Sequence, residues 1–203
     1  MSDPLRDVER AVAALKRGGV VVYPTETLYG LGVDATDEYA LQKLVALKGR
    51  EAGKPISVLV SDEEMLGRVA ASVSPVARRL MRRFWPGPLT LALPAQPGVS
   101  PLLTGDGATV GVRCSSHPLA AALVAGLGRP VTTPSANPAG KTPPVSLVQA
   151  RAYFGASVDV YIDGGVLSGG DGSTVVDSAG EPRILRQGAI SAADIAAALR
   201  EES

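Results

Sequence analysis

Apolar residues follow two different spacings along this 203-residue chain. Leu5, Val8, Val12 and Leu15 recur every three or four positions, which predicts an amphipathic helix ended by the glycines at 18 and 19. Short continuous apolar runs instead predict buried strands. These runs fall at residues 20–23, 56–60, 89–93, 109–113 and 158–162.

Further helices are predicted over residues 37–48, in two segments after residue 60, over 117–127 and 145–154, and after Ser191. Ser74 before Pro75 and His117 before Pro118 each combine an N-terminal cap with proline at the first helical position. Residues 130–133 are predicted to be short and extended, and residues 174–176 and 183–185 to be strands. Residues 25–32 and the segment between the strands 89–93 and 109–113 are predicted to be loops, because they are rich in glycine, proline or hydroxyl groups.

Helices interleaved with short strands predict an α/β fold with a single mixed sheet covered by helices. The hairpin-like pair of strands near the C-terminus is equally typical of an α+β fold. The sequence shows no internal repeat and no linker long enough to divide it, so we expect one domain over residues 1–203.

Composition narrows the functional classes. Twenty basic and twenty acidic residues balance, which gives no reason to expect a protein that coats nucleic acid or a membrane surface. The single cysteine, Cys114, excludes an internal disulfide, and the single histidine, His117, excludes a site built from two imidazoles. The charged N-terminus and the lack of about 18–20 consecutive apolar residues predict a soluble cytoplasmic protein.

Three cations lie close together in the segment 48–55, between a predicted helix and a predicted strand. Lys48, Arg50 and Lys54, called the basic cluster below, would repel one another without an anion between them. The cluster therefore favours a polyanionic ligand such as the phosphates of a nucleotide, and a solvated loop is the alternative. If these side chains are exposed, Lys48→Ala and Arg50→Ala should impair use of the ligand and leave the melting temperature nearly unchanged.

Polar loops also recur at the ends of predicted strands, at residues 25–27, 113–116, 132–137 and 168–174. In open α/β sheets such loops converge on ligands. Their hydroxyls and amide suit a ribose or a small zwitterion, and Arg113 and Arg186 suit a carboxylate or phosphate. Each Ser, Thr or Asn taken alone is equally explained as a turn or cap residue.

Other chemistries are poorly supported. The glycine-rich turn 164–172 lacks the Lys-Ser/Thr ending of a P-loop, and His117 is better explained as a helix cap than as a general base. Cys114 beside Arg113 could have a lowered pKa, although a small buried residue at a strand end is the simpler interpretation. Asp163, Asp171 and Asp177 are explained by turns and caps, so we predict no metal site in the protein itself.

Five separated motifs, in order, resemble the YrdC-like domain of threonylcarbamoyl-AMP synthases. They are residues 24–32 (PTETLYGLG), 48–55 (KGREAGKP), 110–118 (VGVRCSSHP), 134–137 (PSAN) and 173–177 (STVVD). The resemblance extends over nearly the whole chain to residue 188. It implies a twisted open mixed sheet flanked by helices, with a large basic concave cavity, in the short form that lacks the extra C-terminal domain of longer members.

The resemblance also implies an activity: joining L-threonine, bicarbonate and ATP into threonylcarbamoyl-AMP with release of pyrophosphate. The product would pass to the proteins that modify adenosine 37 of tRNA, while direct contact with tRNA is left open. Mg²⁺ is expected to arrive on the ATP, with no protein ligand identified. Carried over by position, the ATP contacts are Lys48, Arg50, Lys54, Thr109, Ser135, Asn137, Pro143 and Arg186, with Lys48 and Arg50 catalytic. The L-threonine contacts are Thr27, Arg113, Thr133 and Ser173.

Two positions depart from the family pattern: Glu51, where many relatives have proline, and Leu59, where some have histidine. Two other functions remain open. One is an RNA-binding module on the same fold, which zero net charge and few aromatic residues disfavour. The other is a domain that forms carbamoyl-adenylate from carbamoyl phosphate, as in hydrogenase maturation proteins.

Overall fold

The chain begins with a helix and a strand that the sequence signals define well. In the computed structural model, which describes residues 3–50 and 53–200, α1 (Pro4–Leu15) starts after Asp3, whose side chain accepts a hydrogen bond from the Leu5 amide. It ends before Gly18, whose φ of 70° suits glycine. The next strand, β1 (Val21–Pro24), is buried along its whole length.

Strand β1 is the centre of a three-stranded sheet. It pairs antiparallel with β2 (Tyr29–Gly32) and parallel with β7 (Val160–Tyr161). The second sheet has six strands in the order β6 (Val131–Thr132), β3 (Val58–Leu59), β5 (Thr109–Arg113), β4 (Leu89–Pro94), β8 (Thr174–Asp177) and β9 (Arg183–Arg186). Parallel and antiparallel pairs occur in both sheets, so the mixed α/β class is confirmed.

The strands are divided between two sheets, where the sequence predicts one. The two sheets meet where the chain after β2 runs beside β6, joined by the isolated bridge between Asp34 and Val131. Thr132 strengthens this junction, because its hydroxyl accepts from the Val33 amide and donates to the Leu31 carbonyl. Strand β2 lies inside a segment predicted as loop. A side chain at Gly32 would collide with the Tyr23 ring, so close packing, and not a turn, requires this glycine.

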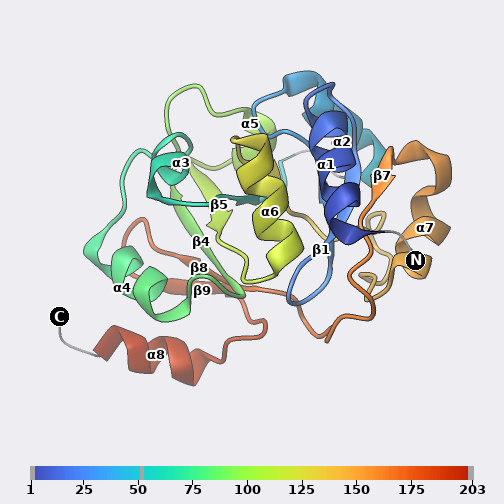
Figure 1. Cartoon of the computed structure of the whole chain (residues 1–203). Helices are drawn as coiled ribbons and strands as arrows, with labels where there is room; N and C mark the ends of the chain where they lie inside the picture. Colours follow the sequence, from blue (N-terminus) through green and yellow to red (C-terminus); the bar gives the residue numbers. More distant parts are fainter. Residues whose placement is uncertain (1–2, 51–52, 201–203) are drawn as a thin grey trace.

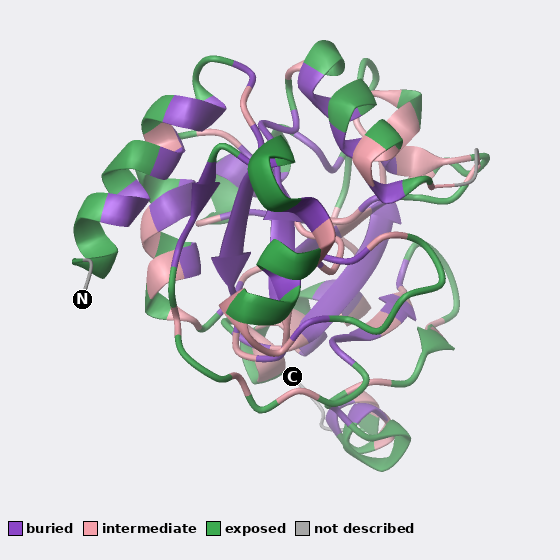
Figure 2. Cartoon of the chain, turned by 90° about the vertical axis from the view of Figure 1, so that its right-hand side faces the viewer, coloured by how far each residue is buried: buried purple, intermediate pink, exposed green. Residues whose placement is uncertain are grey.

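Helices cover the sheets, as Figure 1 shows. They are α2 (Glu38–Lys48), α3 (Glu63–Gly67), α4 (Pro75–Phe84), α5 (Pro101–Thr104), α6 (Pro118–Leu127), α7 (Leu147–Phe154) and α8 (Ala192–Arg200), with a 3₁₀ turn at Gly155–Ser157. Helices α1 and α6 lie side by side and contact β1, while α8 packs on α4. Figure 2 shows strands buried between helices whose outer faces are exposed, while β9, at the edge of the second sheet, is itself largely exposed. Helix α5 lies in a segment predicted as loop.

The predicted caps are confirmed. Ser74 caps α4, and the Nδ1 atom of His117 accepts a hydrogen bond from the Leu119 amide at 3.2 Å, so this histidine is a helix cap. Asp37 caps α2, which runs to Lys48 and stops at Gly49 with φ 55°. No helix within residues 3–50 or 53–200 is long and apolar enough to cross a membrane.

Candidate active site

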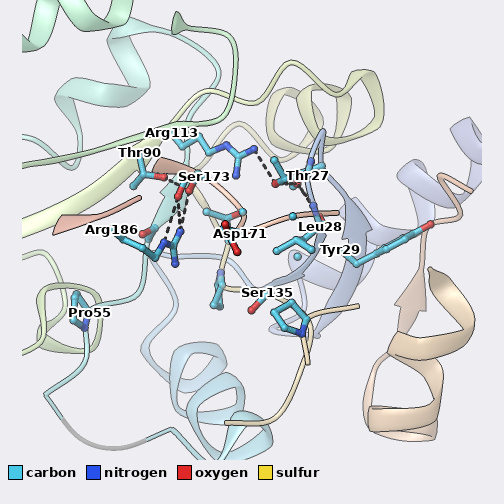
Figure 3. Close-up of a pocket in the computed structure, with 18 of the residues that line it drawn as sticks. Thr27, Leu28, Tyr29, Pro55, Thr90, Arg113, Ser135, Asp171, Ser173 and Arg186 are labelled. Carbon is cyan, nitrogen blue, oxygen red and sulfur yellow. Dashed lines mark hydrogen bonds between the residues drawn. The ribbon is translucent and has the colours of Figure 1, made fainter. Parts of the chain in front are cut away.

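Loops from both sheets enclose a cavity with a volume of about 510 Å³. The β1–β2 turn, the segment after α2, the start of β4, the end of β5, the loop after β6, the glycine-rich turn before β8 and the end of β9 all contribute to its wall. Figure 3 shows these side chains converging from segments far apart in the sequence. Arg50, Arg113 and Arg186 give the wall a basic character, with Asp171 as a single carboxylate among the described residues that line it.

The cavity brings together eight of the twelve predicted site residues. These are Thr27, Arg50, Arg113, Thr133, Ser135, Pro143, Ser173 and Arg186. The other four, Lys48, Lys54, Thr109 and Asn137, lie outside its lining. The same cavity is thus lined by residues predicted to contact ATP and by residues predicted to contact L-threonine.

Arg113 is buried at the end of β5 and is held by three neighbours. Its Nη2 atom lies 2.8 Å from Oε1 of Glu26 and 3.4 Å from Oγ1 of Thr27, and its Nε donates to the Gly87 carbonyl at 3.2 Å. Burial alone would raise the pKa of Glu26, but the Arg113 charge and hydrogen bonds from Arg113 and Ser115 outweigh it. The net pKa of Glu26 is therefore lowered, and the pair is ionised at neutral pH.

The turn that carries Thr27 is built by a hydroxyl. Thr25 Oγ1 donates to the Leu28 carbonyl at 2.7 Å and accepts from the Leu28 amide at 3.2 Å, which closes the turn between β1 and β2. The same hydroxyl lies 3.2 Å from Oγ1 of Thr27. The turn therefore fixes a pair of threonine hydroxyls next to the Arg113 guanidinium.

Opposite this turn, Arg186 is fixed on Ser173. Its Nη2 atom donates to the Ser173 carbonyl at 2.8 Å and to Ser173 Oγ at 3.2 Å. Ser173 Oγ in turn lies 2.8 Å from Oγ1 of Thr90 on β4. Strands β4, β8 and β9 thus set the position of one guanidinium that faces the cavity (Figure 3).

The contacts of the basic cluster differ from the expected contacts with an anionic ligand. The Lys48 side chain is buried, and its ammonium donates to the carbonyls of Ser135 and Asn137, each at 2.6 Å. Arg50 Nη2 donates to the Pro55 carbonyl at 2.6 Å, while its side chain lines the cavity. Carbonyl oxygens therefore already face Lys48 and Arg50. The premise that Lys48 is exposed is wrong, and with it the expectation that Lys48→Ala leaves stability unchanged.

Several other predicted residues have structural contacts. The amide nitrogen of Asn137 donates to the carbonyls of Pro138 and Lys141, and Thr109 pairs with Pro94 at the start of β5. Lys54 is exposed. Leu59 is buried in β3, and Glu51 lies outside the described residues.

Cys114 is partly buried, and the simpler interpretation of a buried residue is only partly right. Burial, followed by the charges of Glu26 and Asp62, raises the pKa of its thiol, so the lowered value that Arg113 could have produced is wrong.

Sequence reasoning missed some residues of the site. Thr90 and Ser57 line the cavity from within predicted strands. Side chains alternate between the two faces of a strand, and the sequence does not show which face borders a cavity and which borders the core. Glu26 lies between two threonines of a recognised motif, but its partner Arg113 is 87 residues away. The sequence signal that could have identified Glu26 was its position directly before Thr27, a predicted ligand contact.

Comparison with known proteins decides the family. Residues 13–188 match the family model of the Sua5, YciO and YrdC proteins, which carries the description "Telomere recombination". This chain belongs to the Sua5/YciO/YrdC family. Among its relatives in that family, the threonylcarbamoyl-AMP synthase of Thiobacillus denitrificans is 44% identical over 174 residues, which cover 86% of this chain and 92% of that protein.

Solved structures of the Sua5/YciO/YrdC family have the same fold. The crystal structure of Pyrococcus abyssi Sua5 complexed with L-threonine superposes with a TM-score of 0.92 at 35% identity, covering 99% of this chain and 59% of that one. The E. coli YciO crystal structure gives a TM-score of 0.84 at 28% identity, covering 94% and 93%. The chain thus spans little more than half of the archaeal protein and nearly all of YciO.

Proposed function

We propose that this chain is a threonylcarbamoyl-AMP synthase, a nucleotidyltransferase that uses L-threonine, bicarbonate and ATP. Its product would serve the N6-threonylcarbamoyladenosine modification at position 37 of tRNA. The observation that carries the proposal is the single cavity in which Arg113 and Thr27 face Arg50, Arg186 and Ser135. An amino acid and a nucleotide can react only if they are held side by side, and this cavity offers groups suited to both.

The proposed reaction needs no nucleophile from the protein. The threonine amine attacks the carbon of CO₂ and loses a proton to form a carbamate, or it attacks bicarbonate and forms the same carbamate with loss of water. A carbamate oxygen then attacks the α-phosphorus of ATP, and the bond to pyrophosphate breaks. The protein has to bring the reactants together, neutralise charge on the phosphoryl group and exclude water from the labile carbamate. Fixed guanidinium groups such as those of Arg50 and Arg186 can provide that neutralisation without reorganising during the reaction.

Mg²⁺ is proposed to enter with ATP and to neutralise part of the triphosphate charge. Within the described residues, no group of three or more His, Cys, Asp or Glu side chains could hold a metal ion. A magnesium ion bound to a nucleotide takes most of its ligands from phosphate oxygens and water. ATP, bicarbonate, delivery to the tRNA-modifying proteins and a cytoplasmic location remain predictions.

Pyrophosphate release tests the proposal. The purified chain should release pyrophosphate from ATP only when L-threonine and bicarbonate are both present, and the adduct should be detected by mass spectrometry. Release that continues without either substrate would refute the synthase activity. Activity with carbamoyl phosphate in place of threonine and bicarbonate would instead support a carbamoyl-adenylate-forming enzyme.

A further inference from the structure

Asp171 places a negative charge in a cavity that otherwise has a basic wall. Among the described residues that line the cavity, the charged ones are three arginines and this aspartate. A carboxylate here repels a triphosphate, so direct contact with the phosphates gives no reason for it. Figure 3 shows Asp171 between the Arg186–Ser173 pair and the Thr27–Leu28 turn, on the boundary between the two predicted substrate regions.

The backbone around Asp171 is held in place although the residue itself is exposed. On one side, the Gly169 amide donates to the Thr27 carbonyl at 3.1 Å, and Ser168 Oγ donates to the Glu26 carbonyl at 3.0 Å. On the other side, the Gly172 carbonyl accepts from the Ala189 amide at 2.9 Å. The turn is therefore tied to the threonine-bearing loop at one end and to the segment after β9 at the other.

Glycine on both sides makes this placement conformationally accessible. Gly170 and Gly172 have φ values of 87° and 74°, which side chains with a Cβ rarely adopt. A Cβ on Gly172 would also lie 3.3 Å from the Leu28 side chain. The tight turn thus packs Gly172 against Leu28 and leaves Asp171 between two residues that have no side chain.

The carboxylate is not consumed by a structural ion pair. Asp171 makes no direct ion pair among residues 3–50 and 53–200, whereas Glu26 is paired with Arg113. Its charge acts on Arg186 at longer range and partly offsets the lowering of the pKa of that guanidinium by burial and by Arg113. A carboxylate that lines a binding cavity and makes no direct ion pair suits a cationic ligand group. L-Threonine supplies such a group in its ammonium, while its carboxylate suits an arginine.

We propose that Asp171 receives the ammonium group of L-threonine and so helps select an amino acid for this site, an inference that rests on the proposed synthase function. The contact belongs to substrate capture. Once the nitrogen has become a carbamate, that end of the substrate is anionic, and Asp171 no longer attracts it. Loss of the carboxylate should therefore weaken threonine binding and raise KM for threonine, with a much smaller change in kcat.

The test compares two ligands and two proteins by ligand-observed NMR titration. The ligands are L-threonine and 3-hydroxybutyrate, which keeps the carboxylate and the hydroxyl but lacks the amine. The proteins are the unmodified chain and Asp171→Asn, which preserves the shape of the side chain. A charge-assisted hydrogen bond is worth roughly 1.5–3 kcal/mol, so Asp171→Asn should bind threonine about 10- to 150-fold more weakly. It should bind 3-hydroxybutyrate as the unmodified chain does.

Glu181→Gln is the matched control, because it removes an exposed negative charge from the β8–β9 connection, away from the cavity lining. It should change neither affinity. Equal threonine affinity in the Asp171→Asn variant and the unmodified chain would overturn the inference. Equal losses for both ligands, or a raised KM for ATP with a shifted Mg²⁺ dependence, would also overturn it, in favour of a role in loop structure or nucleotide binding. If the unmodified chain releases pyrophosphate without threonine, the proposed function fails as well.

Discussion

The ammonium of Lys48 donates to the carbonyl oxygen of Ser135 at 2.6 Å, joining the end of α2 to the loop after β6. The same ammonium bonds the carbonyl of Asn137. Ser135 lines the cavity, so Lys48 lies immediately behind the wall that faces the proposed nucleotide. One buried charge therefore supports the wall and contributes positive potential to the cavity.

Lys48→Ala should destabilise the protein. The substitution leaves two carbonyl oxygens without their donor, and each hydrogen bond to a charged group contributes roughly 1.5–3 kcal/mol. We expect the free energy of unfolding to fall by about 2 kcal/mol or more, measured by chemical denaturation. Arg17→Ala, at an exposed position after α1, is the control and should change it by less than about 0.5 kcal/mol. Equal stability of both variants would contradict the buried contacts.

Deprotonation of the Lys48 ammonium should also produce an alkaline limb, a fall in kcat/KM at high pH, in the pH profile of the reaction. Burial, followed by the charge of Arg50, lowers the pKa of Lys48 to about 8. The positive charge is present below that pH and is lost above it, so kcat/KM for ATP should fall as the pH rises through about 8. Lys48→Arg keeps its charge throughout this range and should lack the limb. A limb of the same position in Lys48→Arg would assign it to another group.

Glu26→Gln should cost stability in a way that depends on pH. The lowered pKa of Glu26 means that its pairing with Arg113 stabilises the fold fully above the ordinary carboxyl pKa of 4.5. This contribution is lost as the pH falls through the lowered value. The variant should therefore be less stable by roughly 1–3 kcal/mol at pH 7, and the difference should shrink below pH 4.5. A constant difference between pH 7 and pH 3 would contradict the ion pair.

Much of the fold could be predicted from local signals. Ser74 and His117 cap the helices that their positions indicate, because capping depends on residues within one turn. Strand β2 could not be found in this way. Gly30 and Gly32 disfavour a strand locally. Their presence is explained by tertiary packing, because the Tyr23 ring lies against both and the side chains of Val21 and Val131 also crowd Gly32.

The site was predictable as a set of motifs but not as a network. Arg113, Ser173 and Arg186 were identified because their motifs are recognisable in the sequence, and they do meet in the cavity. The burial of Lys48 could not be foreseen, since its carbonyl partners belong to a segment 87 residues further along the chain. Charge spacing shows which cations are close together, and it does not show which oxygens already satisfy them.

Gly188→Ala should disturb the wall that carries Arg186. An added Cβ would collide with the backbone of Ser173 and Gly172, which cannot move without shifting Arg186 and the turn before β8. We expect at least a tenfold loss of kcat/KM for ATP, about 1.4 kcal/mol of transition-state stabilisation. Gly180→Ala has open space around its added methyl and is the control in steady-state kinetics. Equal kinetics in the two variants would show that the wall tolerates displacement.

The central claim is that one cavity holds a nucleotide and an amino acid side by side. A crystal structure determined with ATP and L-threonine, without bicarbonate, tests it most directly. We predict both ligands in the cavity, with the triphosphate near Arg50 and Arg186 and the threonine carboxylate near Arg113. Finding either ligand bound on another face of the molecule, with the cavity occupied by neither or by only one of them, would contradict the account.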